Sequence, residues 1–532
     1  MKQHFVFFLT IYFLALSFHT TSTSIVAQNI ADNVEVTWGN QHKEKSGSYI
    51  TEVIGIDEEQ IYVLRYRRPM GGLAMLQNAP SYLIEAYDKE GNFKSNQELP
   101  NKFDKMRMEF EFVIHFNNRL LLFNSSYDRS NKNNVLYMQE IDKRTLATKG
   151  KPQQVALAKS RSRGNAGDFG YELSFNRKKL AIVDFAAYQR KEQDEFGAQV
   201  FDKDMNLLWQ KDMKVPYQDH LFDIEGFEVD NQGNFYLFAI VYEGRAVKRR
   251  GGKANYHYSI WSYTDKGNNT KEYKMDLDDS FITDMTFRIS NSGEIVCAGF
   301  YSPKSSFRIT GTFYQKINPQ TTEVELQTTK PFDTQFLAEF MSDKKAEKGR
   351  GLYRFDLDNM VLRNDGGAIL MAEQFYIDER TTASRVGYTR DTRVDYYYYY
   401  NDIIVVNMAP TGEIEWATKV PKYQVTTNDG GHFSSYSYML KGSNIHLIYN
   451  DNPKNLFPSN VGKRTHSFNG KKSVVTLATL SADGHLKRSL LFSNQDERII
   501  TRPKACEQMS IDQMVICGEW GRRAKVGILT FD

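Results

Sequence analysis

The chain has 532 residues, of which 41% are hydrophobic and 13% aromatic. This composition is ample for a packed core and, with 31 Tyr and 35 Phe, leans towards β-structure. Since 68 basic residues almost balance 65 acidic ones, the net charge of +3 gives no reason to expect a nucleic-acid partner.

The N-terminus has the pattern of a signal peptide. Lys2 supplies a positive charge, the stretch FVFFLTIYFLALSF at 5–18 is apolar, and small residues follow as far as Ala27. A membrane anchor is the alternative, but a spanning helix needs about 20 apolar residues. We therefore expect residues 1–27 to be cleaved. The mature chain is expected to be secreted or periplasmic, without a transmembrane segment.

One pattern recurs along the chain and is clearest at 227–240, FEVDNQGNFYLFAI. Apolar and polar residues alternate on both sides of the turn at 231–233, which is typical of a β-hairpin. A turn followed by a nearly continuous apolar strand occurs eight times, at 56–59, 117–118, 176–177, 231–233, 290–293, 364–367, 441–443 and 511–513. Each copy predicts the inner hairpin of one blade of a β-propeller.

A second series of seven turns alternates with the first, at 88–91, 142–144, 202–206, 264–267, 318–319, 410–412 and 481–484. The missing eighth turn is explained if the last strand, 526–532, pairs with VEVTW at 34–38. Closing the ring in this way leaves no unpaired strand edge. The sequence thus predicts an all-β fold, a β-propeller of eight four-stranded blades, in a single domain over residues 28–532. Seven blades is the alternative.

Two local features stand apart from the repeats. At 333–351, Phe336, Leu337, Phe340 and Met341 recur at helical spacing and predict a short helical insertion over a blade junction. The three cysteines, Cys297, Cys506 and Cys517, allow one disulfide in an oxidising compartment. Cys506 and Cys517 are the candidate pair, but we favour three buried thiols.

The outer turn at 408–416, MAPTGEIEW, resembles the Thr-Gly…Trp repeat of quinoprotein-type eight-bladed propellers, and VFDKDMNLLW at 200–209 is similar but lacks the Thr-Gly. That family includes quinone-cofactor dehydrogenases and non-enzymatic outer-membrane assembly propellers. The dehydrogenases carry a vicinal disulfide at the cofactor, whereas this chain has no adjacent cysteine pair. The resemblance therefore implies a propeller of the kind found in secreted bacterial proteins. It carries no activity over to this chain.

The loops between the second and third strands of all blades lie on one face of a propeller, and here they are long. They are expected at 65–81, 124–134, 184–197, 242–258, 301–311, 373–402, 450–473 and 519–525. Within them Lys and Arg exceed Asp and Glu by about 12, against 3 for the whole chain. The strands and the opposite face must therefore be net acidic. A one-sided basic face suits an anionic partner, although long loops are also charged simply because they are solvated.

The densest basic cluster is RAVKRRGGK at 245–253, which is followed by the aromatic stretch YHY at 256–258. Basic residues interleaved with aromatic ones can hold a polyanion by charge and by stacking. Further clusters lie before the five tyrosines at 396–400 and at 463–472. The candidate ligand-binding residues are Arg245, Lys248, Arg249, Arg250, Lys253, Tyr256, Tyr258, Arg385, Arg390, Arg393, Lys463 and Arg464. The alternative for each is a solvated loop, and for the tyrosine run it is packing within a strand.

Signals of catalysis are weak. No two histidines of the mature chain have helical metal-ligand spacing, and residues 202–206 lack the glycine and glutamate that complete a calcium loop. The sequence has no nucleophile elbow and no phosphate loop. We therefore expect no cofactor, no metal and no catalytic residues. The enzyme question stays open with a leaning against activity.

These observations favour a monomeric, non-enzymatic binding or scaffold propeller whose basic face binds an anionic glycan, lipopolysaccharide or an envelope protein. One alternative is a carbohydrate-active enzyme, a glycosidase or lyase, with its site at the central channel. Carboxylates on the inner strands with shifted pKa values would favour that alternative. Another alternative is a structural component of a cell-envelope complex.

Overall fold

The computed structural model describes residues 31–532 except 69–79, 252, 279, 304–305, 322, 387–388 and 461–463. The predicted signal peptide, residues 1–27, lies outside the described residues. Within them, no helix has the length and apolar character needed to cross a membrane.

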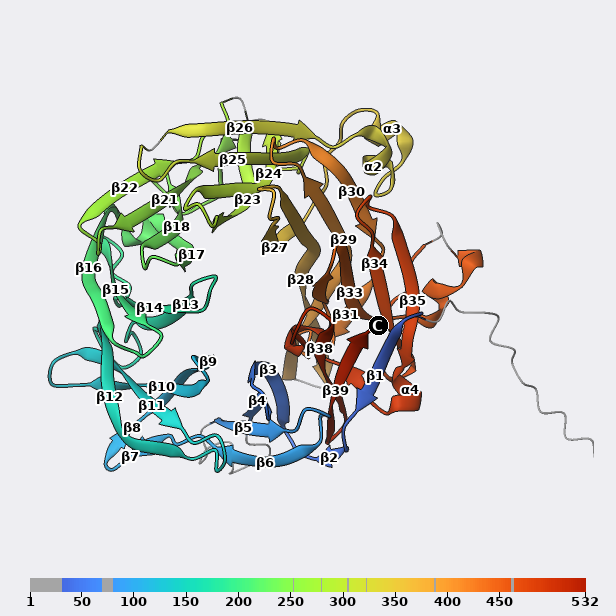
Figure 1. The fold of residues 1–532 in the computed structure, drawn as a ribbon. Coiled ribbons are helices and arrows are strands. Elements are labelled where there is room, and N and C mark those ends of the chain that lie inside the picture. Colours follow the sequence, from blue (N-terminus) through green and yellow to red (C-terminus); the bar gives the residue numbers. More distant parts are fainter. Residues whose placement is uncertain are drawn as a thin grey trace, which may run out of the picture.

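The described residues form eight antiparallel sheets of four to six strands each, and these sheets stand side by side in a ring (Figure 1). Consecutive strands of the chain pair within each sheet, so that each sheet is one blade whose first strand lies nearest the centre of the ring. This arrangement is a β-propeller, as the repeats predicted.

The strands of blades 1 to 8 take the following places. The first strands are β3 (Ser48–Ile56), β9 (Glu109–Phe116), β13 (Asp168–Leu173), β17 (Phe222–Val229), β23 (Ser280–Ile289), β27 (Phe355–Leu362), β32 (Ser437–Lys441) and, in blade 8, the short pair β36 (Ile500–Thr501) and β37 (Glu507–Gln508). The second strands are β4 (Ile61–Arg67), β10 (Arg119–Asp128), β14 (Lys179–Phe185), β18 (Phe235–Tyr242), β24 (Ile295–Pro303), β28 (Ala368–Val386), β33 (Asn444–Asp451) and β38 (Gln513–Trp520). The third strands are β5 (Ser81–Tyr87), β11 (Asn133–Ile141), β15 (Gln193–Asp202), β21 (Tyr256–Thr264), β25 (Gly311–Ile317), β29 (Thr389–Met408), β34 (Val474–Leu480) and β39 (Arg523–Phe531). The outer strands are β6 (Phe93–Glu98), β12 (Thr148–Lys159), β16 (Leu207–Gln218), β22 (Asn269–Lys274), β26 (Val324–Pro331), β30 (Ile414–Val420), β35 (Leu486–Ser493) and β1 (Val34–Trp38).

Short elements complete the fold. They are the strands β2 (His42–Lys43), β7 (Lys102–Phe103), β8 (Met106–Arg107), β19 (Arg249–Arg250), β20 (Lys253–Ala254) and β31 (Gln424–Thr427), the helices α2 (Thr334–Ala338), α3 (Asp343–Ala346) and α4 (Asn494–Glu497), and the 3-10 turns η1 (Asp219–Leu221), η2 (Pro453–Leu456), η3 (Pro458–Asn460), η4 (Gly470–Lys472) and η5 (Pro503–Ala505).

The ring closes through its two ends, as predicted. The N-terminal strand β1 pairs antiparallel with β39, from Val34 opposite Phe531 to Trp38 opposite Gly527. The indole of Trp38 meets the Phe492 ring edge-on, with centroids 5.3 Å apart. The closing sheet therefore combines residues from both termini, and it covers the edge that β39 would otherwise expose.

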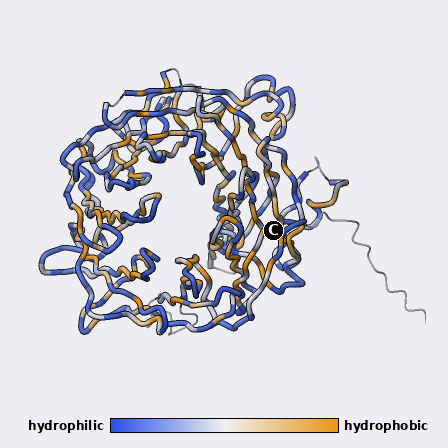
Figure 2. The backbone as a smooth tube through the Cα atoms, in the orientation of Figure 1, coloured by the Kyte–Doolittle hydropathy of each residue, from blue (hydrophilic) through white to orange (hydrophobic). Residues whose placement is uncertain are grey.

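The core lies between neighbouring blades. All eight residues of β18 are buried, because both faces of the strand pack against other sheets. Such a strand is apolar throughout instead of alternating, which explains the near-continuous apolar runs in the sequence. Figure 2 shows the same gradient, with hydrophilic segments along the outer rim and apolar segments on the strands further in.

Several local predictions need correction or refinement. The predicted loop at 373–402 is mostly a long hairpin, in which β28 pairs with β29 from Ala368 as far as Val386. The Tyr, Thr and Val residues there favour strand structure, so the two strands stay paired beyond the end of the blade. The segment at 333–351 contains two short helices, and the Asp333 side chain accepts a hydrogen bond from the Phe336 N–H at 2.7 Å at the start of α2. The favoured prediction for the cysteines is confirmed, since all three are buried free thiols and the alternative pair, Cys506 and Cys517, is not bonded.

Candidate functional site

The basic cluster at 245–253 is an exposed hairpin on blade 4. Arg249 and Arg250 in β19 pair with Ala254 and Lys253 in β20. The Arg245, Lys248, Arg249, Arg250 and Lys253 side chains are all exposed. Asn255 is buried below the hairpin, and its amide donates to the carbonyl oxygens of Arg245 and Val247 at 2.8 and 3.2 Å. The guanidinium of Arg249 lies 5.0 Å from the centre of the Phe307 ring, so the hairpin leans over blade 5.

The prediction that Tyr256 and Tyr258 offer stacking surfaces is wrong. They are only 9% and 3% exposed, since β21 begins at Tyr256 and its side chains pack between blades 4 and 5. The Tyr256 hydroxyl donates to the carbonyl oxygen of Ile282 at 2.7 Å. The hairpin therefore offers charge without these two rings.

The remaining predicted residues lie on other blades. Arg385 and Arg390 occupy paired backbone positions in the β28–β29 hairpin of blade 6. Arg393 is exposed and pairs with Asp395 at 2.8 Å. Arg464 is exposed in the loop of blade 7, and Lys463 lies outside the described residues. The candidates thus belong to three separate loops on blades 4, 6 and 7.

The inner strands carry a feature that the sequence analysis missed. In blades 2, 4 and 6 a β-bulge interrupts the pairing of the first strand with the second, and the extra residue is acidic each time: Glu111, Glu225 and Asp358. Blades 1 and 5 have the same bulge with Thr51 and Thr283, whose hydroxyls donate to carbonyl oxygens of the second strand. An ionised carboxylate has no proton to donate in this way. Since bulges redirect side chains and are frequent beside active sites, these three residues are candidates for function.

The surroundings of these carboxylates hold their pKa values high. Removal of water by the surrounding protein raises the pKa of Glu111 and of Asp358 to about 7, and it also raises that of Glu225. On the neighbouring inner strand, burial raises the pKa of Asp284 to about 6, although its Oδ2 accepts a hydrogen bond from the Leu357 N–H at 2.7 Å. The Tyr436 hydroxyl donates to Asp358 Oδ2 at 3.0 Å. Carboxylates with such pKa values can take up or release a proton near neutral pH.

Two of the three bulge residues lie in an acidic cavity beside the inner strands of blades 2, 3 and 4. Its volume is about 720 Å³. Its wall contains seven carboxylates and one basic residue, Arg163. The carboxylates are Glu109, Glu111, Asp168, Asp194, Asp219, Asp223 and Glu225. We call this space the acidic cavity.

The acidic cavity also differs from what the loop charges suggested. Part of its wall is the loop between β14 and β15, one of the loops of the predicted basic face. Asp194 is the second residue of β15, directly after this loop. Burial raises its pKa to about 7, and the nearby Asp219 raises it further. The face therefore has an acidic hollow at blades 2 to 4 and a basic hairpin beside it.

Lys248 connects the predicted basic hairpin with the inner strands. Its ammonium group favours the charged forms of Glu225, Asp284 and Asp356, which lie on the first strands of blades 4, 5 and 6, and it offsets part of the rise in their pKa values caused by burial. Such an effect requires the charge to lie within electrostatic range of all three. Lys248 is therefore a predicted residue whose charge reaches the inner carboxylates of blades 4, 5 and 6.

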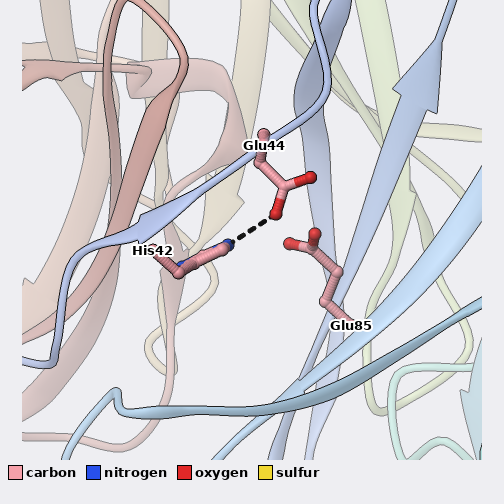
Figure 3. Close-up of side chains that lie close together, drawn as sticks. All are labelled: His42, Glu44 and Glu85. Carbon is pink, nitrogen blue, oxygen red and sulfur yellow. Dashed lines mark ion pairs between the residues drawn. The ribbon is translucent and has the colours of Figure 1, made fainter.

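A second acidic group lies at the seam between blades 1 and 8. His42, Glu44 and Glu85 have ligand atoms within 4.8 Å of one another, and they point toward one another (Figure 3). His42 Nε2 lies 2.9 Å from Glu44 Oε1. The buried Arg65 guanidinium already pairs with Glu85 at 2.6 Å and lies 3.8 Å from Glu44. A metal ion here would have to share these carboxylates with that cation, so we interpret the group as an ion-pair network.

An acidic residue between two neighbours in a first strand was visible in the sequence, as in FEF at 110–112, IEG at 224–226 and LDN at 357–359. In a regular strand, however, the same pattern marks an ordinary polar position. The extra residue of a bulge appears only in the pairing register.

Comparison with known proteins finds distant similarities in structure and no relative by sequence. No protein-family model matches the sequence, and no curated protein sequence matches it. The β-propeller domain of the Trilobed protease from Pyrococcus furiosus is similar in structure, with a TM-score of 0.34, 13% identity, and coverage of 85% of this chain and 97% of that chain. An alpha-L-arabinanase from Penicillium chrysogenum has a TM-score of 0.30 and 11% identity over 63% of this chain and 94% of its own. A Synechocystis apocarotenoid oxygenase has a TM-score of 0.30 and 10% identity over 87% of this chain and 91% of its own. None of these similarities bears on what this β-propeller does.

Proposed function

We propose that this protein is a ligand-binding propeller whose acidic cavity takes up a cationic partner. The observation that carries this proposal is the charge of the cavity wall, where seven carboxylates stand against Arg163. Several like charges in a partly enclosed space repel one another, and a cationic partner relieves that repulsion. The charge of this proposed partner is opposite in sign to that of the anionic partner predicted from the loop charges alone.

The raised pKa values agree with a cationic partner. Asp194 and Glu111 both have a pKa of about 7, because burial and neighbouring carboxylates disfavour their charged forms. A cationic group in the cavity would favour those charged forms. Binding should therefore release protons near neutral pH, which is a measurable signature.

Retention on immobilised poly-L-lysine provides the direct test. The protein should be retained on poly-L-lysine at low salt and elute as salt is raised, because such contacts are screened. The variant Glu111→Gln/Asp194→Asn/Glu225→Gln should elute at lower salt than the matched control Glu58→Gln/Glu59→Gln/Glu90→Gln, which removes three carboxylates from exposed turns. Equal elution of the two variants would contradict the cavity as the site.

The basic hairpin supports a second candidate function, binding of an anionic glycan, lipopolysaccharide or an envelope protein. The observation that favours it is that five cationic side chains project from one anchored hairpin and are all exposed. Retention on heparin tests it. The charge-reversal variant at Arg245, Lys248, Arg249 and Arg250 should lose heparin retention. Unchanged retention would contradict this function.

A carbohydrate-active enzyme is supported by one specific observation. Asp358 lies at an inner-strand bulge, accepts a hydrogen bond from Tyr436 and has a pKa of about 7, as a general acid requires. A panel of polysaccharides, assayed for new reducing ends or unsaturated products, tests it. Activity that is abolished in Asp358→Asn would support an enzyme, and no product from any polysaccharide would count against it.

The place of action is also a proposal. The leader-like residues 1–27 suggest export, so the partner would be met in the periplasm or outside the cell. Fractionation of cells that express the full chain with a C-terminal tag tests export, since an exported chain leaves the cytoplasmic fraction and loses the mass of its leader.

A further inference from the structure

The carboxylates of the acidic cavity are spread over its wall and do not converge on one point. Among the described residues, no three of them bring carboxylate oxygens within 4.8 Å of one another. A calcium ion holds its oxygen ligands at about 2.3–2.6 Å, so any two of its ligands lie within about 5 Å of each other. The cavity is therefore poorly arranged for a single divalent cation.

The carboxylates form two acidic centres that come from different parts of the wall. The first contains Glu109 and Glu111 of β9 with Asp168 of β13, and the second contains Asp194 of β15, Asp219 of η1, and Asp223 and Glu225 of β17. At the blade 2 end, the negative charges of Asp168 and Glu109 raise the pKa of Glu111, in addition to the effect of burial. At the blade 4 end, Asp219 and Asp223 act on Asp194 in the same way. Each centre thus contains one carboxyl group that burial and its neighbours hold partly protonated near neutral pH. Each centre can accept one positive charge.

A neutral side chain in the cavity also lacks a partner. Asn134, the second residue of β11, is only 6% exposed, yet it contributes to the cavity wall. Within the described part of the chain, the Asn134 amide has no side-chain hydrogen bond. Nearly all buried polar groups in folded proteins have a partner. The side-chain amide of Asn134, which lines the cavity, is therefore available to hydrogen-bond a ligand.

The rest of the wall suits a chain of methylene groups. Phe185, Phe222 and Ile224 contribute apolar surface to it, and Tyr188 is 55% exposed there. An ammonium group lying over a tyrosine ring gains a further favourable contact. The volume of about 720 Å³ is within the range of small-molecule sites, roughly 300–1,000 Å³.

We infer that the cavity binds a linear ligand that carries two or more ammonium groups, such as a polyamine or a short lysine-rich peptide. This inference rests on the proposed function and specifies the chemical class of the ligand. One ammonium group occupies the centre around Glu111 and Asp168, and another occupies the centre around Asp194 and Asp219. The intervening methylene groups contact the apolar wall.

Calorimetric titration of the full chain at low salt with spermine, n-butylamine and calcium chloride tests this inference. A second charge-assisted contact within the same ligand strengthens its binding. Spermine should therefore bind at least about tenfold more tightly than n-butylamine. Tetralysine, titrated alongside, tells whether a peptide presents its ammonium groups as well as a free polyamine does. Tight binding of either one supports the inference.

Variants at the two centres complete the test. Glu111→Gln and Asp194→Asn should each weaken spermine binding about tenfold, while the control Glu58→Gln leaves it unchanged. Two independent variants guard against a folding defect in one of them, and circular dichroism checks that each is folded. Calcium binding as tight as spermine binding, or equal affinities for spermine and n-butylamine, would overturn the inference and leave the cationic site standing. No binding of any cation would overturn the proposed function itself.

Discussion

Arg65 of blade 1 and Glu519 of blade 8 form a buried ion pair across the seam where the ring closes, with Arg65 Nη1 3.1 Å from Glu519 Oε1. Arg65 is 1% exposed and also pairs with Glu85 at 2.6 Å. The second oxygen of Glu519 lies 3.5 Å from Arg502 Nη1. The ring is thus closed by the β1–β39 backbone pairing within blade 8, and the seam between blades 8 and 1 is held by a network of buried charges.

Replacing Arg65 should destabilise the protein severely. Arg65→Met leaves Glu85 and Glu519 buried without this cation, and breaking a buried pair from one side costs about 3–5 kcal/mol. The control is Arg67→Met, because Arg67 pairs with the more exposed Glu98 and such surface pairs contribute about 1 kcal/mol or less. Thermal and urea unfolding measure both. Similar losses for the two variants would contradict a special role of the seam.

Gly527 should tolerate no side chain. A Cβ atom there would lie 2.5 Å from a ring carbon of Trp38 and 3.0 Å from the Thr37 carbonyl oxygen. Gly527→Ala must therefore push β1 away from β39, at a cost of about 1–3 kcal/mol as for other overpacked sites. Gly226→Ala is the matched control, since no heavy atom lies within 4 Å of its new Cβ. Unfolding midpoints compare the two, and equal midpoints would mean that the closing pair contributes little.

The repeat architecture could be predicted from the sequence because it depends on local signals. Alternating strands and Gly or Asn turns mark each hairpin, and the unpaired strand at 34–38 completes the last blade. The directions of side chains depend on a longer range of information. Tyr256 and Tyr258 follow a basic stretch and seemed exposed, but β21 begins at Tyr256 and buries both rings.

The acidic cavity could not be predicted for a related reason. Glu111 and Glu225 become special because each is the extra residue of a bulge, and a shift of pairing by one residue leaves no trace in the sequence pattern. The other carboxylates of the cavity come from loops and inner strands of blades 2 to 4. Only the ring brings these residues to one wall.

The pH dependence of stability should reveal Glu111. Burial raises its pKa from 4.5 to about 7 in the folded protein, so the folded state holds this proton more tightly than the unfolded chain does. The stability that this proton provides is complete below about pH 4.5 and is lost as the pH rises through about 7. Glu111→Gln has no such proton to lose.

Urea unfolding at pH 5 and at pH 8 measures this effect. Relative to the wild type, Glu111→Gln should be more stable at pH 8 than at pH 5. Glu58→Gln, in an exposed turn, should differ from the wild type equally at both pH values. A Glu111→Gln profile parallel to that of the wild type would show that the carboxyl group is ionised in the folded protein across this range.

Lys248 should weaken the binding of cations to the acidic cavity. Its ammonium acts on Glu225, which belongs to the cavity wall, and on Asp284 and Asp356 of the next two blades. Removing this charge leaves the carboxylates more attractive to a cationic ligand. Lys248→Gln should therefore bind spermine severalfold more tightly at low salt, and the gain should shrink at high salt because salt screens the interaction.

Lys253→Gln is the matched control, since it removes the same charge from the same exposed hairpin, and it should change the affinity less. Calorimetric titration at two salt concentrations measures the three proteins. Equal gains for both variants would mean that the hairpin acts through its total charge, and an unchanged or lower affinity of Lys248→Gln would contradict the electrostatic role of Lys248.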